Sequence, residues 1–227
     1  MDALLLIINF VAMSIKHPKY KCVIFDCDGV LVDSEAIGNQ VLVELANGLG
    51  ASIDLDYALT HFKGGSMNSG MEKISKLISA PMPSDFEAQY RALSFKRFKS
   101  NIQPIKGILE IVKQLKVPFC VASSGPVSKI RLNLEYTELL PYFEGRIFSC
   151  YDINKWKPDP AIYLLAAKTM GFKPSDCVVI EDSVIGATAA KAGGFTVFGY
   201  GEHDTENELS AIADVVFSNM KDLEDLL

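Results

Sequence analysis

The sequence predicts an α/β fold in which a doubly wound parallel sheet forms the core and an α-helical cap domain is inserted into it. Two observations support this prediction. From residue 102 onward, short apolar runs alternate with segments of helical periodicity, which is typical of parallel strands joined by right-handed helical crossovers. The stretch 34–101, in contrast, shows helical patterns without a convincing strand. We therefore expect a Rossmann-like core with a helical insertion after its first strand.

Strands are predicted where apolar and often β-branched residues run together for a few positions. The first covers 20–25 and ends directly before Asp26. The others cover 118–122, 145–148, 177–180, 196–198 and 214–217. Their apolar character suits strands that are covered by helices on both faces.

Helices are predicted where apolar residues recur at intervals of three and four. In the cap they cover 35–49, 55–62, 67–78 and 85–98, and Ser84 is a candidate N-cap for the last of them. In the core they cover 107–115, 127–134, 158–170, 184–192 and 220–227. Asp159 is a candidate N-cap, with Pro160 at the first helical position.

These patterns divide the chain into three parts. Residues 20–33 and 102–227 are expected to form the catalytic core, and residues 34–101 the helical cap. Residues 1–19 are expected to be an extension outside the fold, and Met13 is a candidate for the natural start. The apolar run 3–13 is too short to span a bilayer, and Asp2 stands where a signal peptide carries positive charge. A signal peptide or membrane tether stays the alternative interpretation.

The composition argues against two classes of protein. The 227 residues include 22 Lys and Arg against 28 Asp and Glu, a net charge of −6, and no basic block interleaved with aromatic residues. Nucleic-acid binding is therefore not expected. The five cysteines are odd in number and form no Cys-x-x-Cys pair, which indicates reduced thiols in a cytoplasmic protein rather than a disulfide framework.

Polar side chains follow four of the predicted strands at the same end. They are Asp26 and Asp28 after the first strand, Ser123, Ser124 and Gly125 after the second, Lys157 in the loop after the third, and Glu181 and Asp182 after the fourth. Because parallel strands end at one edge of a sheet, these groups are expected to converge at one site. Paired carboxylates there can hold a divalent cation, and one of them can attack as a nucleophile while the other moves protons.

The order and spacing of these four groups resemble the four motifs of the haloacid dehalogenase superfamily, in the branch with a helical cap inserted after the first motif. The resemblance extends from Tyr20 to the end of the chain. It implies that Asp26 is the nucleophile that forms an aspartyl-phosphate. It also implies that Asp28 is the general acid and base, and that Lys157 bridges the phosphate and the nucleophile.

The same resemblance implies a Mg²⁺ site and a phosphate cradle. Asp26, Asp182 and the backbone carbonyl of Asp28 are the expected metal ligands, and Glu181 lies in direct contact with the metal or one step removed. Ser123, Ser124 and Gly125 are expected to hold the phosphoryl oxygens through a hydroxyl and backbone amides.

Several of these residues also have a purely structural interpretation. Ser123 could cap the following helix, and Glu181 could serve only as a support. Lys155 is expected to be a solvated surface lysine, and Cys27 a spacer because neighbouring carboxylates raise the pKa of its thiol. The position of Trp156 is left open between packing over its loop and lining the entrance.

Asp28 favours phosphoryl transfer within the family, because relatives that attack carbon lack an acid at its position. The alternative is a phosphotransferase similar to β-phosphoglucomutase. Those enzymes carry a histidine, an arginine and a lysine where this chain has Gly38, Met67 and Pro126. Since these groups serve the second phosphate of a mutase, their loss favours a hydrolase. A non-catalytic metabolite-binding module is a further alternative.

The segments around Lys63, Gly125 and Lys157 are similar to bacterial sugar-phosphate phosphatases, of the kind that act on 6-phosphogluconate. We therefore expect a Mg²⁺-dependent phosphomonoester hydrolase for a small sugar phosphate, with Lys63 in the cap loop meeting a substrate anion. A surface charge is the structural alternative for Lys63. The partners expected are a small phosphate ester and no membrane or nucleic acid, and the protein is expected to be a monomer or weak dimer.

Overall fold

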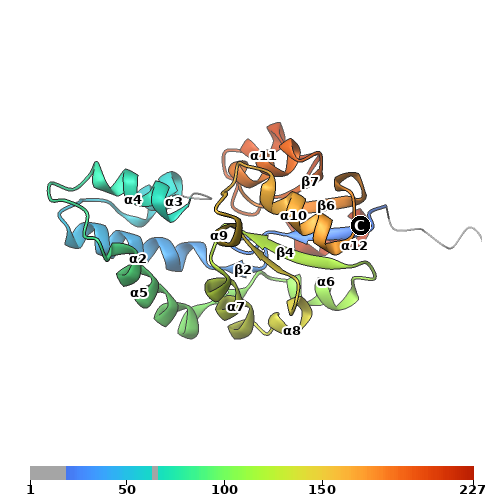
Figure 1. Ribbon diagram of the computed structural model, residues 1–227, viewed down its shortest axis with the longest axis horizontal. Helices are drawn as coiled ribbons and strands as arrows, with labels where there is room; N and C mark the ends of the chain where they lie inside the picture. The colour runs from blue at the N-terminus through green and yellow to red at the C-terminus, as the bar shows by residue number, and fades with distance from the viewer. Residues whose placement is uncertain (1–18, 63–65) are drawn as a thin grey trace, which may run out of the picture.

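The computed structural model describes residues 19–62 and 66–227. Figure 1 shows a sheet flanked by helices on one side of the molecule and a separate group of helices on the other. The predicted extension 1–19 and the predicted substrate-binding Lys63 lie outside the described residues, Lys19 excepted.

The core is a parallel sheet of six strands, as the sequence predicts. In spatial order the strands are β5 (Ile147–Ser149), β4 (Phe119–Ser123), β1 (Cys22–Phe25), β6 (Cys177–Glu181), β7 (Thr196–Tyr200) and β8 (Val215–Phe217). The chain moves outward from β1 to β5, then returns to β6 on the other side of β1 and moves outward again. This reversal creates a crevice at the carboxyl ends of the central strands, where ligands bind in open α/β sheets.

The register of β1 aligns the motif-bearing strand ends. Phe25, the last residue of β1, pairs with Val121 of β4 on one side and Ile180 of β6 on the other. The three strands therefore end at nearly the same height along the sheet. Asp26 and Glu181 come one residue after Phe25 and Ile180, and Ser123 comes two residues after Val121.

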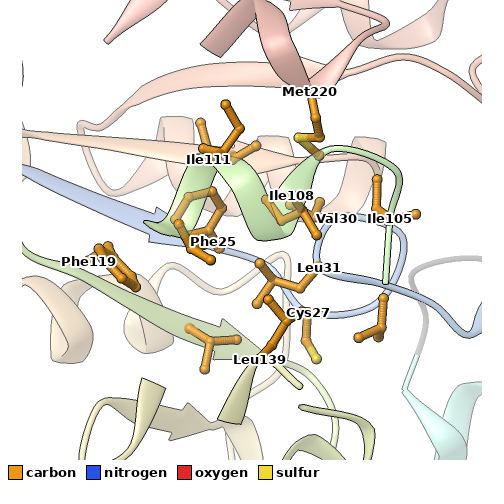
Figure 2. Packing of buried hydrophobic residues seen from close by; sticks show 14 of the residues in the cluster. Phe25, Cys27, Val30, Leu31, Ile105, Ile108, Ile111, Phe119, Leu139 and Met220 are labelled. Atoms are coloured by element: carbon orange, nitrogen blue, oxygen red, sulfur yellow. The ribbon is translucent and has the colours of Figure 1, made fainter. Parts of the chain in front are cut away.

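Helices cover both faces of the sheet because the side chains of β1 alternate between two hydrophobic clusters. Val23 and Phe25 face α6 (Ile108–Gln114), α7 (Val127–Tyr136), α8 (Leu140–Phe143) and α12 (Leu223–Leu226). Figure 2 shows Phe25 between Phe119 and the α6 residues Ile108 and Ile111. Cys22 and Ile24 face α10 (Ala161–Met170) and α11 (Val184–Ala192).

The inserted segment consists of helices α2 (Glu35–Gly48), α3 (Leu55–Phe62), α4 (Met67–Ser75) and α5 (Phe86–Asn101). They enclose a hydrophobic cluster of their own, which includes Val41, Phe62, Ile74 and Phe86. The division into a cap at 34–101 and a core on either side of it stays a prediction.

Two short strands connect the inserted segment to the core. β2 (Val32–Asp33) and β3 (Gln103–Pro104) pair antiparallel where the chain leaves the core and where it returns. The sequence analysis does not predict them, because a strand of two residues is too short to show a periodic pattern.

Several element boundaries differ from the prediction. α5 begins at Phe86 with Asp85, not Ser84, as its N-cap residue. α10 begins at Ala161 with Pro160, not Asp159, as its N-cap residue, and the amide of Ala161 donates to Asp159 Oδ1 at 2.9 Å. The last predicted helix is a 3₁₀ turn, η3 (Met220–Asp222), followed by α12. The short elements α8, α9 (Cys150–Ile153), η1 (Pro174–Asp176) and η2 (Glu208–Ala211) are also absent from the prediction.

All five cysteines are buried, and none of them is paired in a disulfide. Within residues 19–62 and 66–227, none of the helices is long and apolar enough to cross a membrane.

Candidate active site

The predicted site residues that the structure describes line one pocket at the carboxyl edge of the sheet. They are Asp26, Asp28, Ser123, Ser124, Gly125, Lys157, Glu181 and Asp182. Residues of the inserted helices, including Gly38, Leu42, Phe62, Met67 and Tyr90, line the same pocket. The pocket therefore lies between the sheet edge and the inserted helices.

Asp26 lies at the base of the pocket, directly after β1. Its backbone amide donates to the carbonyl of Ile180 at 3.0 Å, which extends the parallel pairing with β6 by one residue. Its side chain is 90% buried and accepts a hydrogen bond from Lys157 Nζ at 2.5 Å. A buried strand end and a buried cation thus hold this carboxylate in one position.

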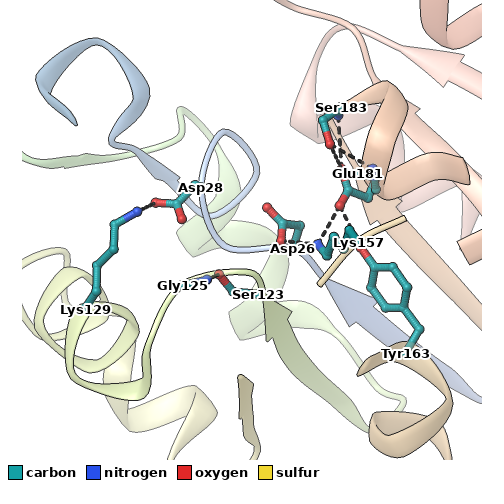
Figure 3. A network of polar contacts seen from close by, with 10 residues as sticks. Asp26, Asp28, Ser123, Gly125, Lys129, Lys157, Tyr163, Glu181 and Ser183 are labelled. Carbon is teal, nitrogen blue, oxygen red and sulfur yellow. Dashed lines mark hydrogen bonds and ion pairs between the residues drawn. The ribbon is translucent and has the colours of Figure 1, made fainter. Parts of the chain in front are cut away.

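Lys157 also bonds to Glu181, so one ammonium serves two buried carboxylates. Its Nζ is 2.7 Å from Glu181 Oε1, and its side chain is only 3% exposed. Tyr163 of α10 donates to the same oxygen at 2.7 Å, as Figure 3 shows. The other carboxylate oxygen of Glu181 accepts from the amide and hydroxyl of Ser183 at 3.0 and 2.9 Å. Glu181 therefore accepts four hydrogen bonds from this network.

Asp26, Glu181 and Asp182 bring carboxylate oxygens within 4.8 Å of one another, a spacing that could hold a metal ion. All three are buried, and their oxygen donors suit a hard divalent cation. Asp182 lies against Gly29, where an added Cβ would come within 2.4 Å of Asp182 Oδ2. Gly29 also has φ of +81°, so the turn after Asp28 depends on glycine at this position.

Asp28 lies away from this cluster and has its own partners. Lys129 of α7 donates to its Oδ1 at 2.8 Å, and the hydroxyl of Ser34 donates to the same oxygen. Figure 3 shows Asp28 between Lys129 and Asp26, with Lys157 beyond Asp26. The two motif aspartates are therefore each paired with a different lysine.

The loop after β4 turns back over the strand end. Ser123 Oγ accepts a hydrogen bond from the amide of Gly125 at 3.0 Å, and the carbonyl of Gly125 accepts from Ser149 Oγ at 2.7 Å. α7 begins later, with Pro126 as its N-cap residue and no side-chain cap. Ser123 therefore does not cap this helix, and its hydroxyl faces the pocket.

Burial and charge shift the pKa values of these groups in opposite directions. Burial raises the pKa of Asp26 to about 8 in spite of Lys157, and Glu181 adds to the rise. Burial also disfavours the charged form of Glu181, but Lys157 outweighs it and holds the pKa of Glu181 below its usual value. One lysine thus compensates one carboxylate charge, and the second charge is left without compensation among these three groups.

Asp28 behaves differently because its lysine is not shared with another carboxylate. Burial favours its neutral form, but Lys129 and Ser34 outweigh burial and lower the pKa of Asp28. The two aspartates of the first motif therefore differ in proton affinity although they lie two residues apart.

Other sequence predictions can be placed in the structure. Cys27 is fully buried, and burial together with Asp28 raises the pKa of its thiol, as the sequence analysis expects. Lys155 is 59% exposed and pairs with Asp159 at 3.5 Å. The ring of Trp156 packs edge-on against Tyr151 with centroids 5.3 Å apart, so it packs within its loop.

Sequence reasoning missed four residues of this site. Lys129 and Arg91 line the pocket, Tyr163 supports Glu181, and Ser34 supports Asp28. Position 126 holds proline where mutases have a lysine, but Lys129, three residues later, lines the pocket. A lysine in the first turn of α7 was the available signal, since that turn follows the Ser123 loop directly.

Comparison with known proteins gives a consistent result. The sequence model of the haloacid dehalogenase-like hydrolases matches residues 20–194. The 6-phosphogluconate phosphatase of Escherichia coli (strain K12) is 34% identical over 181 residues, which is 79% of this chain and 82% of the relative.

Two solved structures share the fold over nearly the whole chain. A haloacid dehalogenase-like protein from Agrobacterium tumefaciens matches with a TM-score of 0.80 at 30% identity, covering 91% of this chain and 97% of that one. A HAD family hydrolase from Deinococcus radiodurans, solved with bound phosphate and sodium, matches with a TM-score of 0.75 at 28% identity, covering 92% and 96%.

Proposed function

Since the chain belongs to the haloacid dehalogenase-like hydrolases and is a phosphatase, we propose that it hydrolyses a small sugar phosphate in a Mg²⁺-dependent reaction through an aspartyl-phosphate. The observation that carries this proposal is the separate pairing of the two motif aspartates. Lys157 bonds to Asp26 at 2.5 Å and Lys129 to Asp28 at 2.8 Å. A nucleophile and a proton-transfer group need such different surroundings.

In the first half of the reaction, Asp26 is the nucleophile. One of its carboxylate oxygens forms a bond to phosphorus while the bond from phosphorus to the ester oxygen breaks. Asp28 gives its proton to the departing alkoxide, so that an alcohol leaves and Asp28 becomes a carboxylate. The nearly complete burial of Asp26 limits the access of water to it before substrate binds.

In the second half, Asp28 acts as the base. It takes a proton from a water molecule that attacks the phosphorus of the aspartyl-phosphate, and the bond from phosphorus to Asp26 breaks. The products are inorganic phosphate and the regenerated carboxylate of Asp26. Lys129 favours the carboxylate form of Asp28, which suits this half of the reaction and opposes the protonated form that the first half needs.

Asp26, Asp182 and the backbone carbonyl of Asp28 are the proposed Mg²⁺ ligands. A bound Mg²⁺ would offset the repulsion between Asp26 and a phosphate dianion. Glu181 supports the site through Lys157, because its two oxygens already accept four hydrogen bonds. Ser123, Ser124 and Gly125 are proposed to hold the phosphoryl oxygens.

The proposed substrate class follows the relative that acts on 6-phosphogluconate, according to its name. The proposed cap, 34–101, would contact the sugar, and Lys63 in its loop is proposed to meet a substrate anion. We further propose a cytoplasmic enzyme that is a monomer or weak dimer.

The test is phosphate release from a panel of sugar phosphates, with and without Mg²⁺, for the wild type and Asp26→Asn. We expect Mg²⁺-dependent release from the wild type and a loss of at least about a thousandfold in the variant, because amide nitrogen and oxygen are poor nucleophiles. Asp152→Asn, an exposed change outside the pocket, is the matched control. Release without Mg²⁺, or full activity of Asp26→Asn, would contradict the proposal.

A β-phosphoglucomutase-type reaction is the second candidate, because Lys129 places a cation in the pocket that the sequence comparison at Pro126 did not reveal. Conversion of β-glucose 1-phosphate in the presence of the bisphosphate, without phosphate release, would favour it. Absence of any turnover would favour a metabolite-binding module.

A further inference from the structure

The pocket is lined by cationic side chains for which the proposed hydrolysis names no contact with the substrate. Among the described residues that line it, three carry a cation: Lys157, Lys129 and Arg91. Lys157 is engaged at the base with Asp26 and Glu181. Lys129 and Arg91 come from other elements, α7 and α5, and neither contacts Asp26 or Glu181 in the described residues.

Lys129 is held in place along its whole length. Its stem crosses Gly125, where an added Cβ would be 3.4 Å from Lys129 Cδ. Its ammonium lies 5.7 Å from the centroid of the Phe98 ring and 2.8 Å from Asp28 Oδ1. The side chain is 18% exposed. Because an ammonium has three donors and Asp28 takes one, the group can donate further hydrogen bonds.

Arg91 is fixed between the inserted helices and the core. Its Nη2 donates to the hydroxyl of Tyr151 at 2.7 Å, and its Cζ lies 5.3 Å from the centroid of that ring. Its Nε donates to Glu87 Oε1 at 2.9 Å, and Nη2 donates to the same oxygen, so the carboxylate of Glu87 partly balances the charge of Arg91. The hydrogen bonds of Arg91 within the described residues use Nε and Nη2, so the guanidinium presents a further edge of donors that suits a carboxylate or phosphate.

The position of these cations relative to the two aspartates decides what they would contact. Figure 3 shows Lys129 on the far side of Asp28 from Asp26. The phosphorus that Asp26 attacks must lie next to the carboxylate of Asp26. The proposed proton donor, Asp28, must lie next to the oxygen of the leaving group. The body of the leaving group therefore extends from Asp28 towards the wall that carries Lys129 and Arg91.

We propose that Arg91 and Lys129 form an anion-binding subsite for the leaving group, so that the preferred substrates are phosphate monoesters that carry a second anionic group. This inference rests on the proposed phosphatase function and narrows its substrate class. A carboxylate and a second phosphate share the required chemistry, since both accept two parallel hydrogen bonds from a guanidinium. An uncharged sugar end would leave the remaining donors of both cations without an anionic partner.

Binding and turnover test the proposal separately. Calorimetry with the Asp26→Asn protein and Mg²⁺ measures the dissociation constants of three six-carbon ligands that differ at the end remote from the reacting phosphate. These are 6-phosphogluconate with a carboxylate, fructose 1,6-bisphosphate with a second phosphate, and glucose 6-phosphate without a second charge. We expect one of the first two to bind about tenfold or more tightly than glucose 6-phosphate, and their order identifies the anion.

Arg91→Gln in the same background is expected to reduce this preference by about tenfold to a hundredfold, the usual effect of losing a charge-assisted hydrogen bond. Lys129→Gln should reduce it as well, and Arg91→Lys by less because the charge is kept. Arg97→Gln is the matched control, since Arg97 lies on the same helix, pairs with Glu44 and does not line the pocket. Thermal unfolding of each variant verifies that it is folded.

Two results would overturn the subsite. One is equal binding of all three ligands by the Asp26→Asn protein, and the other is an unchanged preference in a folded Arg91→Gln variant. Failure of the phosphatase function would look different, because the wild type would then release no phosphate from any ester while the binding preference could still be measured.

Discussion

The ammonium of Lys157 lies between Asp26 and Glu181, and the imbalance of one cation against two carboxylates has a measurable result. Because burial raises the pKa of Asp26 to about 8 in spite of Lys157, we expect this carboxyl to take up a proton in the metal-free protein at a higher pH than an ordinary aspartate does. This pKa lies above the usual value of 3.8, so its contribution to the free energy of unfolding is lost as pH rises from about 4 to 8.

Binding of Mg²⁺ must therefore displace the proton of Asp26. We expect release of up to one proton per Mg²⁺ below about pH 8, with an affinity that rises as much as tenfold per pH unit and then levels off. Calorimetry in buffers of different ionisation enthalpy measures the proton count. Asp26→Asn is the control that removes the linkage, and equal affinities at about pH 6 and pH 8 would contradict the prediction.

Asp28 gives a second prediction at the scale of one residue. If it protonates the leaving group, Asp28→Asn should lower kcat for a sugar phosphate by about a hundredfold to ten-thousandfold. An aryl phosphate with a stable phenolate leaving group needs no such proton, so the rate of aspartyl-phosphate formation from it should fall much less. Single-turnover release of the alcohol or the phenol measures the rate of this step. Equal losses for both esters would assign Asp28 a structural role instead.

At the scale of single elements, the turn from β6 into α11 positions the site. Glu181 folds back over the first turn of α11, where Gly186 leaves room for its carboxylate. An added Cβ at Gly186 would lie 1.7 Å from Glu181 Oε1. The added Cβ and Glu181 Oε1 would overlap, so one of them would have to move. Glycine is therefore needed at position 186 to leave room for the carboxylate of Glu181, and not for backbone freedom.

Gly186→Ala should therefore displace Glu181 from Lys157. We expect kcat to fall by at least about tenfold, and the midpoint of thermal unfolding to fall by about 4–12 °C for a loss of roughly 2–3 kcal/mol. Gly48→Ala at the exposed end of α2 is the matched control, because nothing lies within 4 Å of its added Cβ. A Gly186→Ala protein with the activity and stability of the wild type would contradict this account.

At the scale of the whole molecule, metal binding should couple to global stability. Of the three clustered carboxylates, Asp26 follows β1, Glu181 ends β6 and Asp182 follows it, and the unfolded chain does not hold them together. Mg²⁺ at a hundred times its dissociation constant should add about 2.7 kcal/mol to the free energy of unfolding and raise the midpoint by about 5–10 °C.

Asp182→Asn should remove most of this stabilisation by Mg²⁺, whereas Asp152→Asn should keep it, because Asp152 is exposed on α9. Differential scanning fluorimetry with and without Mg²⁺ measures both shifts. The same increase in Asp182→Asn as in the wild type would exclude Asp182 as a metal ligand.

The local pattern of the chain was sufficient for the six-stranded parallel sheet and for the strands that end in polar residues. A few consecutive residues are enough to predict each of these features, as the apolar run 22–25 before Asp26 illustrates. The short elements β2, β3 and α9 were not predictable, because two to four residues are too few for a period to show.

The sequence by itself therefore determined the fold class, the edge of the sheet that carries the site and the acids, hydroxyls and lysine that meet there. Only the tertiary structure decided which group pairs with which. Lys129 meets Asp28 across 101 positions of the chain, and Arg91 meets Tyr151 across 60. The first pair joins α7 to the turn after β1 and the second joins α5 to α9. No local period or motif encodes a contact between elements that are distant in sequence.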